Sequence, residues 1–349
     1  MHGRVFHNPH SSQLIPAATG IFVFVSGRSQ ESRQMRNGVP TDLRYTTCPM
    51  GSVATLDNIW VGHSRSIAAA LIQSEGHIAI VDPGPGSTLA TLKEQLRQHG
   101  LSIGDLEMLL LTHIHLDHAG ASGALVRENP RIAVYVHKLG APHMVDPSKL
   151  MASALRLWPT ELDTLFGEMI PVPAENLRIL KGGETVQLGN RKIEVAYTPG
   201  HASHHVSYFE QEEGIAFVGD TAGIRIDNSP YIMPATPPPD IDLTIWDVSF
   251  KTIRERKPSR MFLTHFGLAE NPESHLSAFR ERLHHWRAIA ERCIRARPSE
   301  AEAMKAFIEE ALTEVRGHLP EDDAEHYAFS AGLNLTFLGL ARHLRKRGT

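Results

Sequence analysis

The sequence predicts a layered α/β protein, and three observations support this. Strand-like apolar segments alternate with amphipathic helical segments from about residue 52 onward. The strand-like segment LEMLLLT is apolar on both sides, which is typical of a strand covered on both faces. The chain has 349 residues, 42% of them hydrophobic. That length suits one large α/β domain, or one domain with an appendage.

The first elements follow one another without long gaps. SIAAALIQSEG and HIAIVDPGPG are interpreted as two strands joined at Glu75-Gly76. TLATLKEQLRQHG is a predicted amphipathic helix that ends at Gly100. LEMLLLT, AGASGALVREN and RIAVYVH then predict a strand, a helix and a strand.

Residues 142–173 interrupt this alternation with a predicted pair of helices. Asp146-Pro147 begins the first helix, and Thr160 with Asp163 begins the second. The pair would either cover a pocket or pad the core.

Strands resume in NLRIL, ETVQL, RKIEVAYT, VSYFE and GIAFVGD, and the chain is predicted to be helical from Pro272. Ser299 with Glu302 caps the next helix, and a last helix runs toward the basic end. We expect three regions: a flexible or partly β leader over residues 1–50, a main α/β domain over 51–270 with the helical pair inserted at 142–173, and a C-terminal helical region over 271–349.

The N-terminal segment LIPAATGIFVFVSG loosely resembles the apolar part of a signal peptide. Pro16 and Gly20 interrupt it, and no convincing cleavage pattern follows. A leader is therefore the preferred interpretation of residues 1–50.

Composition argues against several kinds of partner. The net charge of −4 provides no basic field for nucleic acid or an anionic membrane. No run of 18 apolar residues predicts a membrane-spanning helix. Cys48 and Cys293 are the two cysteines, too few for a disulfide framework or a thiolate zinc site, so we expect a cytoplasmic protein. The apolar stripes of the helical tail suit either a homodimer or internal packing.

Candidate metal ligands follow the strand LEMLLLT. In THIHLDH, two imidazoles stand two positions apart, on the same side of an extended backbone. Loops beyond the carboxyl ends of strands are where α/β folds build their sites. Imidazole and carboxylate suit Zn²⁺, with Fe or Mn as alternatives. The segment alone would also fit a structural zinc site. Its candidate ligands are His113, His115, Asp117 and His118.

Three more strand-like segments each end in a candidate ligand beside a small or turn residue. TPGHASHH, GIAFVGDTAG and RMFLTHFG supply His201, Asp220 and His265. The total of five His and two Asp exceeds the needs of one tetrahedral ion and suffices for two. We therefore expect two divalent ions, Zn²⁺ first among the candidates, with one bridging carboxylate.

With these motifs in order, the chain resembles the metallo-β-lactamase superfamily of metallohydrolases. The motifs are Asp82 in IVDPGPG, THIHLDH, His201 in TPGH, Asp220 in VGDT and His265 in LTHFG, and the resemblance covers about residues 52 to 270. It implies a four-layer αβ/βα sandwich with the site at one edge of two sheets, here followed by a C-terminal helical extension. It also implies that the first ion binds His113, His115 and His201, and the second Asp117, His118 and His265, with Asp220 bridging.

Departures from the family pattern narrow the expected activity. Position 220 is Asp rather than Cys, which speaks against the antibiotic-degrading branch with its cysteine-containing site. The roughly 45 residues between Asp220 and His265 leave no room for the large inserted domain of the nucleic-acid-cleaving branch. TPGHASHH is closer to the glyoxalase II-like thioesterases. That similarity implies that His205 supports the site through a hydrogen bond.

Two cations about 3.5 to 4 Å apart can share a water and make it hydroxide near neutral pH. Asp117 is expected to orient that hydroxide and accept its proton. Asp82 is interpreted either as the partner of a ligand imidazole or as a turn cap before Pro83. Tyr231, in the stiff proline-rich loop 226–242, would either line the mouth of the site or hold the loop in place.

The leading hypothesis is a binuclear metal-dependent hydrolase of an ester, thioester, lactone or similar small molecule. One alternative is a mono-iron oxidoreductase of the same fold, such as a persulfide dioxygenase, which resembles this chain at His113, His201 and Asp220. A nuclease and a non-catalytic binding protein are the other two.

Overall fold

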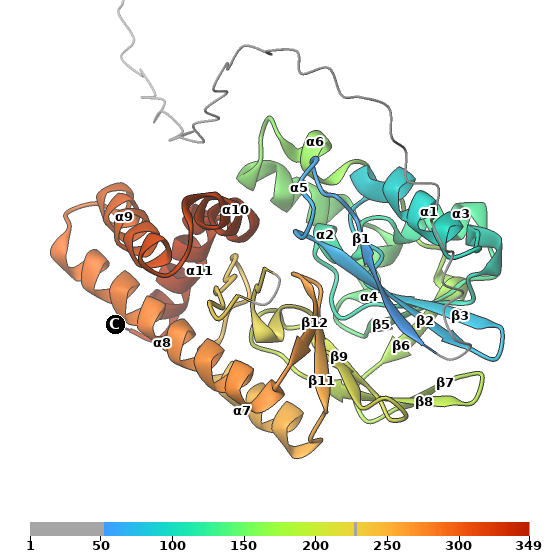
Figure 1. Ribbon diagram of the computed structural model, residues 1–349. Helices are drawn as coiled ribbons and strands as arrows, with labels where there is room; N and C mark the ends of the chain where they lie inside the picture. The colour runs from blue at the N-terminus through green and yellow to red at the C-terminus, as the bar shows by residue number, and fades with distance from the viewer. Residues whose placement is uncertain (1–51, 227–228, 349) are drawn as a thin grey trace, which may run out of the picture. The chain divides into compact units, whose positions relative to one another are not determined.

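The structure is a computed structural model that describes residues 52–226 and 229–348 (Figure 1). The predicted leader over residues 1–50 lies outside the described residues. Two mixed six-stranded sheets form the centre of the described part.

The first sheet has the strand order β1-β2-β3-β4-β5-β6. Its first three strands are antiparallel, and β3 to β6 run parallel. The strands are β1 (Val53–Asp57), β2 (Ala68–Ser74), β3 (His77–Val81), β4 (Met108–Leu110), β5 (Ala133–His137) and β6 (Leu177–Leu180).

The second sheet has the order β12-β11-β10-β9-β8-β7, and its one parallel pair is β10 with β11. The strands are β7 (Thr185–Leu188), β8 (Arg191–Tyr197), β9 (Val206–Glu210), β10 (Ile215–Phe217), β11 (Arg260–Leu263) and β12 (Gly267–Glu270).

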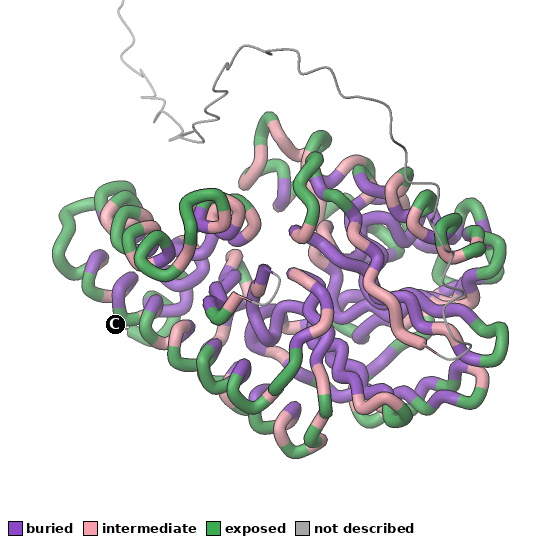
Figure 2. The backbone as a smooth tube through the Cα atoms, viewed as in Figure 1, coloured by how far each residue is buried: buried purple, intermediate pink, exposed green. Residues whose placement is uncertain are grey.

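The alternation of side chains along the strands produces the layers. In β2, Ala68, Ala70 and Ile72 join an apolar cluster between the sheets, whereas Ala69 and Leu71 join a second cluster on the outer face. Figure 2 shows that the central strands are mostly buried. The result is the four-layer sandwich that the motifs predicted.

Helices cover the outer face of each sheet. Those that pack with the first sheet are α1 (Leu89–Gln98), α2 (Leu116–Ala119), α3 (Ser122–Glu128), α4 (Ala141–Val145), α5 (Ser148–Leu157) and α6 (Leu162–Phe166). The predicted pair corresponds to α5 and α6. It packs against the core cluster of this face through Ala154 and Phe166.

The second sheet is covered by α7 (Leu243–Glu255) and by the C-terminal helices α8 (Pro272–Ala296), α9 (Glu300–His318), α10 (Glu321–Ala331) and α11 (Leu333–Lys346). Ser299 caps α9 by accepting a hydrogen bond from the amide of Glu302, as the sequence predicted. The tail has four helices rather than three, because the left-handed Gly332 separates α10 from α11.

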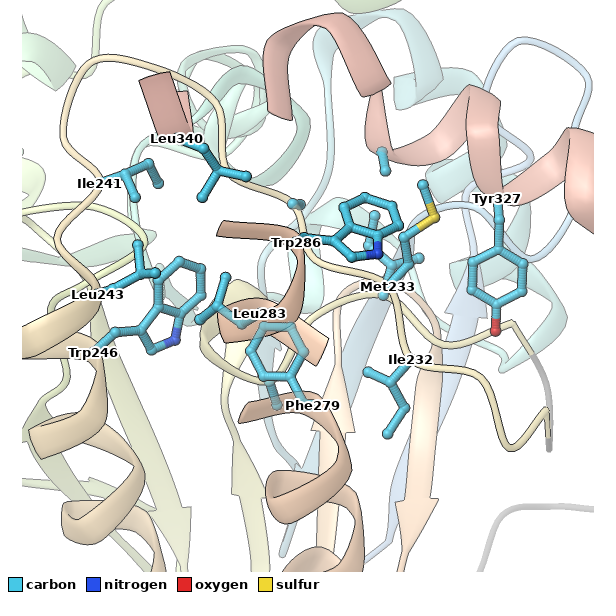
Figure 3. Close-up of a cluster of buried hydrophobic side chains, with 14 of the residues drawn as sticks. Ile232, Met233, Ile241, Leu243, Trp246, Phe279, Leu283, Trp286, Tyr327 and Leu340 are labelled. Atoms are coloured by element: carbon cyan, nitrogen blue, oxygen red, sulfur yellow. The ribbon is translucent and has the colours of Figure 1, made fainter. Parts of the chain in front are cut away.

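One apolar cluster joins α7 and the C-terminal helices to the second sheet. Figure 3 shows Trp246 of α7 beside Phe279 and Leu283 of α8, and the Trp246 and Phe279 rings are 5.8 Å apart. Helix α7 was not predicted from the sequence, although Asp242 caps it by accepting from the amides of Thr244 and Ile245. Among the described helices, none is long and apolar enough to cross a membrane.

Candidate metal centre

The seven predicted donors meet at one edge of the sandwich. The first sheet contributes the segment after β4, and the second sheet contributes the segments after β8, β10 and β11. In order of sequence, these segments carry His113, His115, Asp117 and His118, then His201, Asp220 and His265.

Three imidazoles converge on one point, and we call His113, His115 and His201 the first triplet. The Nδ1 atom of His115 lies 2.9 Å from Nε2 of His113 and 3.1 Å from Nε2 of His201. Three ring nitrogens this close to one another have the arrangement that a single cation requires.

The second triplet consists of Asp117, His118 and His265, whose ligand atoms also lie within 4.8 Å of one another. Asp220 stands between the triplets. Its Oδ2 is 3.4 Å from Nε2 of His201, and its Oδ1 is 3.1 Å from Nε2 of His118 and 3.5 Å from Nε2 of His265. The two oxygens of one carboxylate thus face different triplets.

Hydrogen bonds to the other ring nitrogen fix two imidazoles of the first triplet. Nδ1 of His201 donates to the carbonyl of Ala235 at 3.0 Å, which leaves the lone pair on Nε2. Nδ1 of His113 is 3.1 Å from Oγ1 of Thr112. Because that hydroxyl donates to Asp82 at 2.6 Å, it accepts from the His113 ring, whose Nε2 lone pair then points into the triplet.

The second triplet has the same arrangement. Nδ1 of His118 donates to Oδ2 of Asp82 at 2.8 Å, and Nδ1 of His265 donates to the carbonyl of Ser66 at 2.7 Å. Both rings therefore direct Nε2 toward Asp117 and Asp220, which is the orientation of metal-binding histidines.

Asp82 is fully buried and is a centre of hydrogen bonding. It accepts from the amide and hydroxyl of Thr112, at 2.8 and 2.6 Å, and from the hydroxyl of Thr264 at 2.8 Å. Together with the His118 bond, these contacts favour the interpretation of Asp82 as an imidazole partner. The roles of Thr112 and Thr264 have no local signal in the sequence, because the target of a hydroxyl cannot be inferred from neighbours along the chain.

His205 is buried and connects two strand ends. Its Nδ1 is 3.1 Å from Oγ1 of Thr198 and 3.2 Å from Oγ1 of Thr221, next to Asp220. Gly219 has φ +46°, and a Cβ there would lie 2.5 Å from Oγ1 of Thr112 and 2.7 Å from Nε2 of His205. Only glycine fits this close approach.

The two triplets have opposite protonation preferences. Burial, reinforced by the neighbouring imidazole of His118, lowers the pKa of His113 well below its usual range. Burial and His201 lower the pKa of His115 to about 4. Burial also disfavours protonated His118, but Asp220, Asp117 and Asp82 outweigh it and raise the pKa of His118 well above its usual range.

The carboxylates stay ionised despite their burial. Burial favours the protonated form of Asp117, but His118 and His265 lower its pKa to about 2. His118, His265 and His201 likewise hold the pKa of Asp220 well below its usual range. Two carboxylates in this site therefore require positive charge close by.

A metal ion meets that requirement. Nε2 of His118 and Oδ1 of Asp220 are buried and 3.1 Å apart, yet neither has a hydrogen-bond partner of normal geometry among the described residues. A cation between them would satisfy both atoms and displace the proton that His118 otherwise holds. The donor set thus fits divalent metal.

The most exposed donors are His115 and Asp117, which are half-buried, whereas the other five donors are buried. The side chain of Asp117 is 25% exposed. It is therefore the carboxylate that an incoming molecule can reach.

Tyr231 has a structural environment. It is 1% exposed, its hydroxyl donates to Glu314 of α9 at 3.4 Å, and Arg282 of α8 lies 3.9 Å above its ring. It offers no free face to a substrate, so the structure favours the alternative in which Tyr231 holds its loop. Burial by helices distant in sequence overrides the expectation for a loop residue.

Trp246 of α7 supports the site and was not identified from the sequence. Its ring meets the His201 ring edge-on at 5.7 Å, and its Nε1 donates to the carbonyl of Thr221 at 2.9 Å. A Cβ on Gly200, which has φ +137°, would lie 2.4 Å from Cβ of Trp246. The glycine before His201 thus allows α7 to approach. This glycine is visible in the sequence, but the helix that packs against it was not predicted.

The chain resembles known proteins in both sequence and fold. Residues 65–265 match the family model described as the metallo-beta-lactamase superfamily. Two solved structures share the fold at 20% identity. They are ST1585 from Sulfolobus tokodaii (TM-score 0.58, covering 84% of this chain and 99% of that one) and TTHA1429 from Thermus thermophilus (TM-score 0.62, covering 86% and 95%).

Curated relatives match over part of their length. The chain is 28% identical over 171 residues to the metallo-beta-lactamase fold-containing protein ST1585 of Sulfurisphaera tokodaii, covering 47% of this chain and 61% of that protein. It is 28% identical over 151 residues to a hydroxyacylglutathione hydrolase of Aeromonas hydrophila, covering 43% of this chain and 44% of that protein. The chain thus spans about half the length of these relatives.

Proposed function

Because the chain belongs to the metallo-beta-lactamase superfamily, we propose that it is a binuclear metal-dependent hydrolase acting on an ester, thioester, lactone or similar small molecule. The observation that carries this proposal is the position of Asp220. Its Oδ2 faces the first triplet and its Oδ1 faces the second, so one carboxylate would contact both ions of a pair.

Each triplet would hold one divalent ion, and Asp220 would bridge them. Imidazole and carboxylate donors favour Zn²⁺, with Fe or Mn as alternatives. When bound, such a pair lowers the pKa of a water and polarises a carbonyl oxygen. The two triplets and Asp220 would determine where the ions are held, and therefore where the water is activated and the carbonyl is polarised.

Asp117 would perform the proton work. Its carboxylate is ionised, since its pKa is lowered to about 2 by His118 and His265 against the effect of burial. It is also the more exposed of the two site carboxylates. From this position it can accept a hydrogen bond from the attacking water, direct the oxygen toward the carbonyl carbon and take up the proton.

A thioester is the first substrate class to test. The match to hydroxyacylglutathione hydrolases from several bacteria supports this choice. A lactone or an oxygen ester presents the same carbonyl carbon to the same groups.

The test begins with purification under metal-sparing conditions and quantification of Zn, Fe and Mn. Thioester, lactone, phosphodiester and β-lactam substrates are then screened. We expect two equivalents of metal and turnover of a carbonyl substrate. One equivalent of iron with oxygen consumption would overturn the proposal in favour of an oxidoreductase.

Asp117→Ala then tests the assigned role. We expect turnover to fall by about 100-fold to 10,000-fold, the usual contribution of a general base. Asp247→Ala in α7 is the matched control, because its side chain is 30% exposed, close to the 25% of Asp117, and it pairs with Arg280. Equal turnover in the two variants would refute the role of Asp117.

A further inference from the structure

We propose that helix α10 is a positioning element of the second triplet and acts on His265 through Ser66. This inference rests on the proposed two-ion site. It assigns to the C-terminal helices a part in metal binding, beyond covering the second sheet.

The first step is the contact between His265 and Ser66. Nδ1 of His265 donates to the carbonyl of Ser66 at 2.7 Å. That bond turns Nε2 toward Asp117 and Asp220, 3.4 and 3.5 Å away. Both His265 and Ser66 are buried, so no water replaces the bond easily. The orientation of this ligand therefore depends on where the Ser66 carbonyl lies.

Ser66 lies at the end of the loop between β1 and β2, which has an unfavourable backbone. Ile59, Val61 and Arg65 have φ of +46°, +51° and +63°, a region that side chains rarely adopt and β-branched residues least of all. Asp57 stabilises the loop by accepting from the amides of Ile59 and Arg65, both at 3.0 Å. Such a conformation persists only where the surroundings hold it.

Helix α10 supplies contacts to this loop, 260 residues away in sequence from Ser66. Nε2 of His326 lies 2.8 Å from Oγ of Ser66, within hydrogen-bonding distance. The ring of Phe329 lies 4.7 Å from His63 and 5.1 Å from Trp60. The helix thus holds both the middle and the end of the loop.

The helix is itself anchored on its other side. The hydroxyl of Tyr327 accepts from the amide of Ile226 at 2.7 Å and donates to the carbonyl of Tyr231 at 2.8 Å. Tyr327 is fully buried in the apolar cluster that Figure 3 shows. With Tyr327 fixed, the neighbouring His326 has a defined position over Ser66, so a firmly packed helix holds the strained loop.

The two triplets differ in this dependence. No described contact of α10 reaches the imidazoles of the first triplet, whose fixed nitrogens bond Thr112 and Ala235. Loss of the His326 contact should therefore weaken binding of the second ion and leave binding of the first ion unchanged. Loss of a group that orients a ligand typically costs about 10-fold to 100-fold in metal affinity.

The experiment is a Zn²⁺ titration of metal-free, full-length protein against a competing chelator, which resolves two binding steps. His326→Phe keeps the ring volume but removes the polar atom, and His326→Gln keeps a polar atom near the position of Nε2. We expect His326→Phe to weaken the second step by about 10-fold or more, with the first step unchanged, and His326→Gln to restore most of the affinity. The matched control is His285→Ala, which removes an exposed imidazole of α8.

Ser66→Ala removes the same hydrogen bond from the other side and serves if His326→Phe does not fold. In the double variant Ser66→Ala/His326→Phe, we expect the second step to be no weaker than in either single variant, because one bond is lost in all three. Additive losses, equal losses in both steps, or an unchanged second step would overturn the inference. A parent protein that binds a single ion would instead contradict the proposed function, so the two failures are distinguishable.

Discussion

The first and second triplets are alike in geometry and unlike in what holds them. In the first, the fixed imidazoles bond Thr112, which follows β4, and Ala235 of the loop 226–242, and Trp246 packs on His201. In the second, His118 depends on the buried carboxylate of Asp82, and His265 depends on a strained loop that α10 contacts. The second triplet therefore differs from the first in its reliance on the contact between Ser66 and His326 of α10.

The two triplets also differ in charge. Burial and imidazole neighbours keep the first triplet neutral by lowering the pKa of His113 and His115. Carboxylates raise the pKa of His118 and His265 against the effect of burial. A proton therefore competes with a metal ion for the second triplet more than for the first. Asp220 faces both triplets.

Asp220→Ala should break both triplets at once and have the largest effect. It removes the carboxylate that faces His118, His201 and His265. We expect loss of both ions on dialysis and a fall in turnover of about 1,000-fold or more. Metal analysis and steady-state kinetics check this. Retention of one full equivalent would show that Asp220 serves a single ion.

Trp246→Ala should affect the first triplet and the core. Loss of this buried side chain is expected to lower the free energy of unfolding by about 3 to 5 kcal/mol, as measured by urea titration of the metal-free protein. Affinity for the first ion should also fall. Trp286→Ala, another fully buried tryptophan of the same cluster, is the control, with similar destabilisation but unchanged first-ion affinity.

Asp82→Asn should affect mainly the second triplet. The His118 ring and the hydroxyls of Thr112 and Thr264 all donate to Oδ2, whereas the Thr112 amide donates to Oδ1. An amide in either orientation therefore turns its NH2 group toward at least one of these donors. We expect about 10-fold to 100-fold weaker binding of the second ion, and a smaller change in the first through Thr112. A larger loss of affinity in the first binding step would contradict the assignment of Asp82 to the second triplet.

His275→Gln should leave the metal affinities of both triplets unchanged and alter only the pH dependence of the free energy of unfolding. Nε2 of His275 donates to the carbonyl of Ala222, and burial lowers its pKa from 6.5 to about 4. The unfolded chain then binds a proton that the folded chain does not, so stability falls as pH drops from about 6.5 to 4. We expect His275→Gln to remove about 1 to 2 kcal/mol of the loss between pH 7 and pH 5. Identical pH profiles in urea titrations would contradict this.

The donors could be predicted from the sequence because they follow four strands within a few residues. The period-two pattern and the turn residues around His201, Asp220 and His265 are local signals, and strand ends gather at one edge of a sheet. Asp82 was recognised on the same basis. Its precise partners were not, since Thr112 and Thr264 gain their roles only when the two sheets meet.

Other features depend on contacts between remote segments. Tyr231 is covered by helices α8 and α9, and Ser66 meets a helix 260 residues later, so neither role has a local pattern. Helix α7 directly follows a proline-rich loop, so the local sequence around the Asp242 cap is dominated by residues typical of loops. The division of the chain into three regions stays a prediction.

The donors come from both sheets, three of them from the second and the rest from the first. A pair of ions would therefore act as a cross-link between the two halves of the sandwich. Ligation would add its own free energy to the cohesion of the sheets and slow their separation. Removal of the ions with a chelator should then raise the amide hydrogen exchange rates of β4 and β11 together, even though neither strand contains a donor.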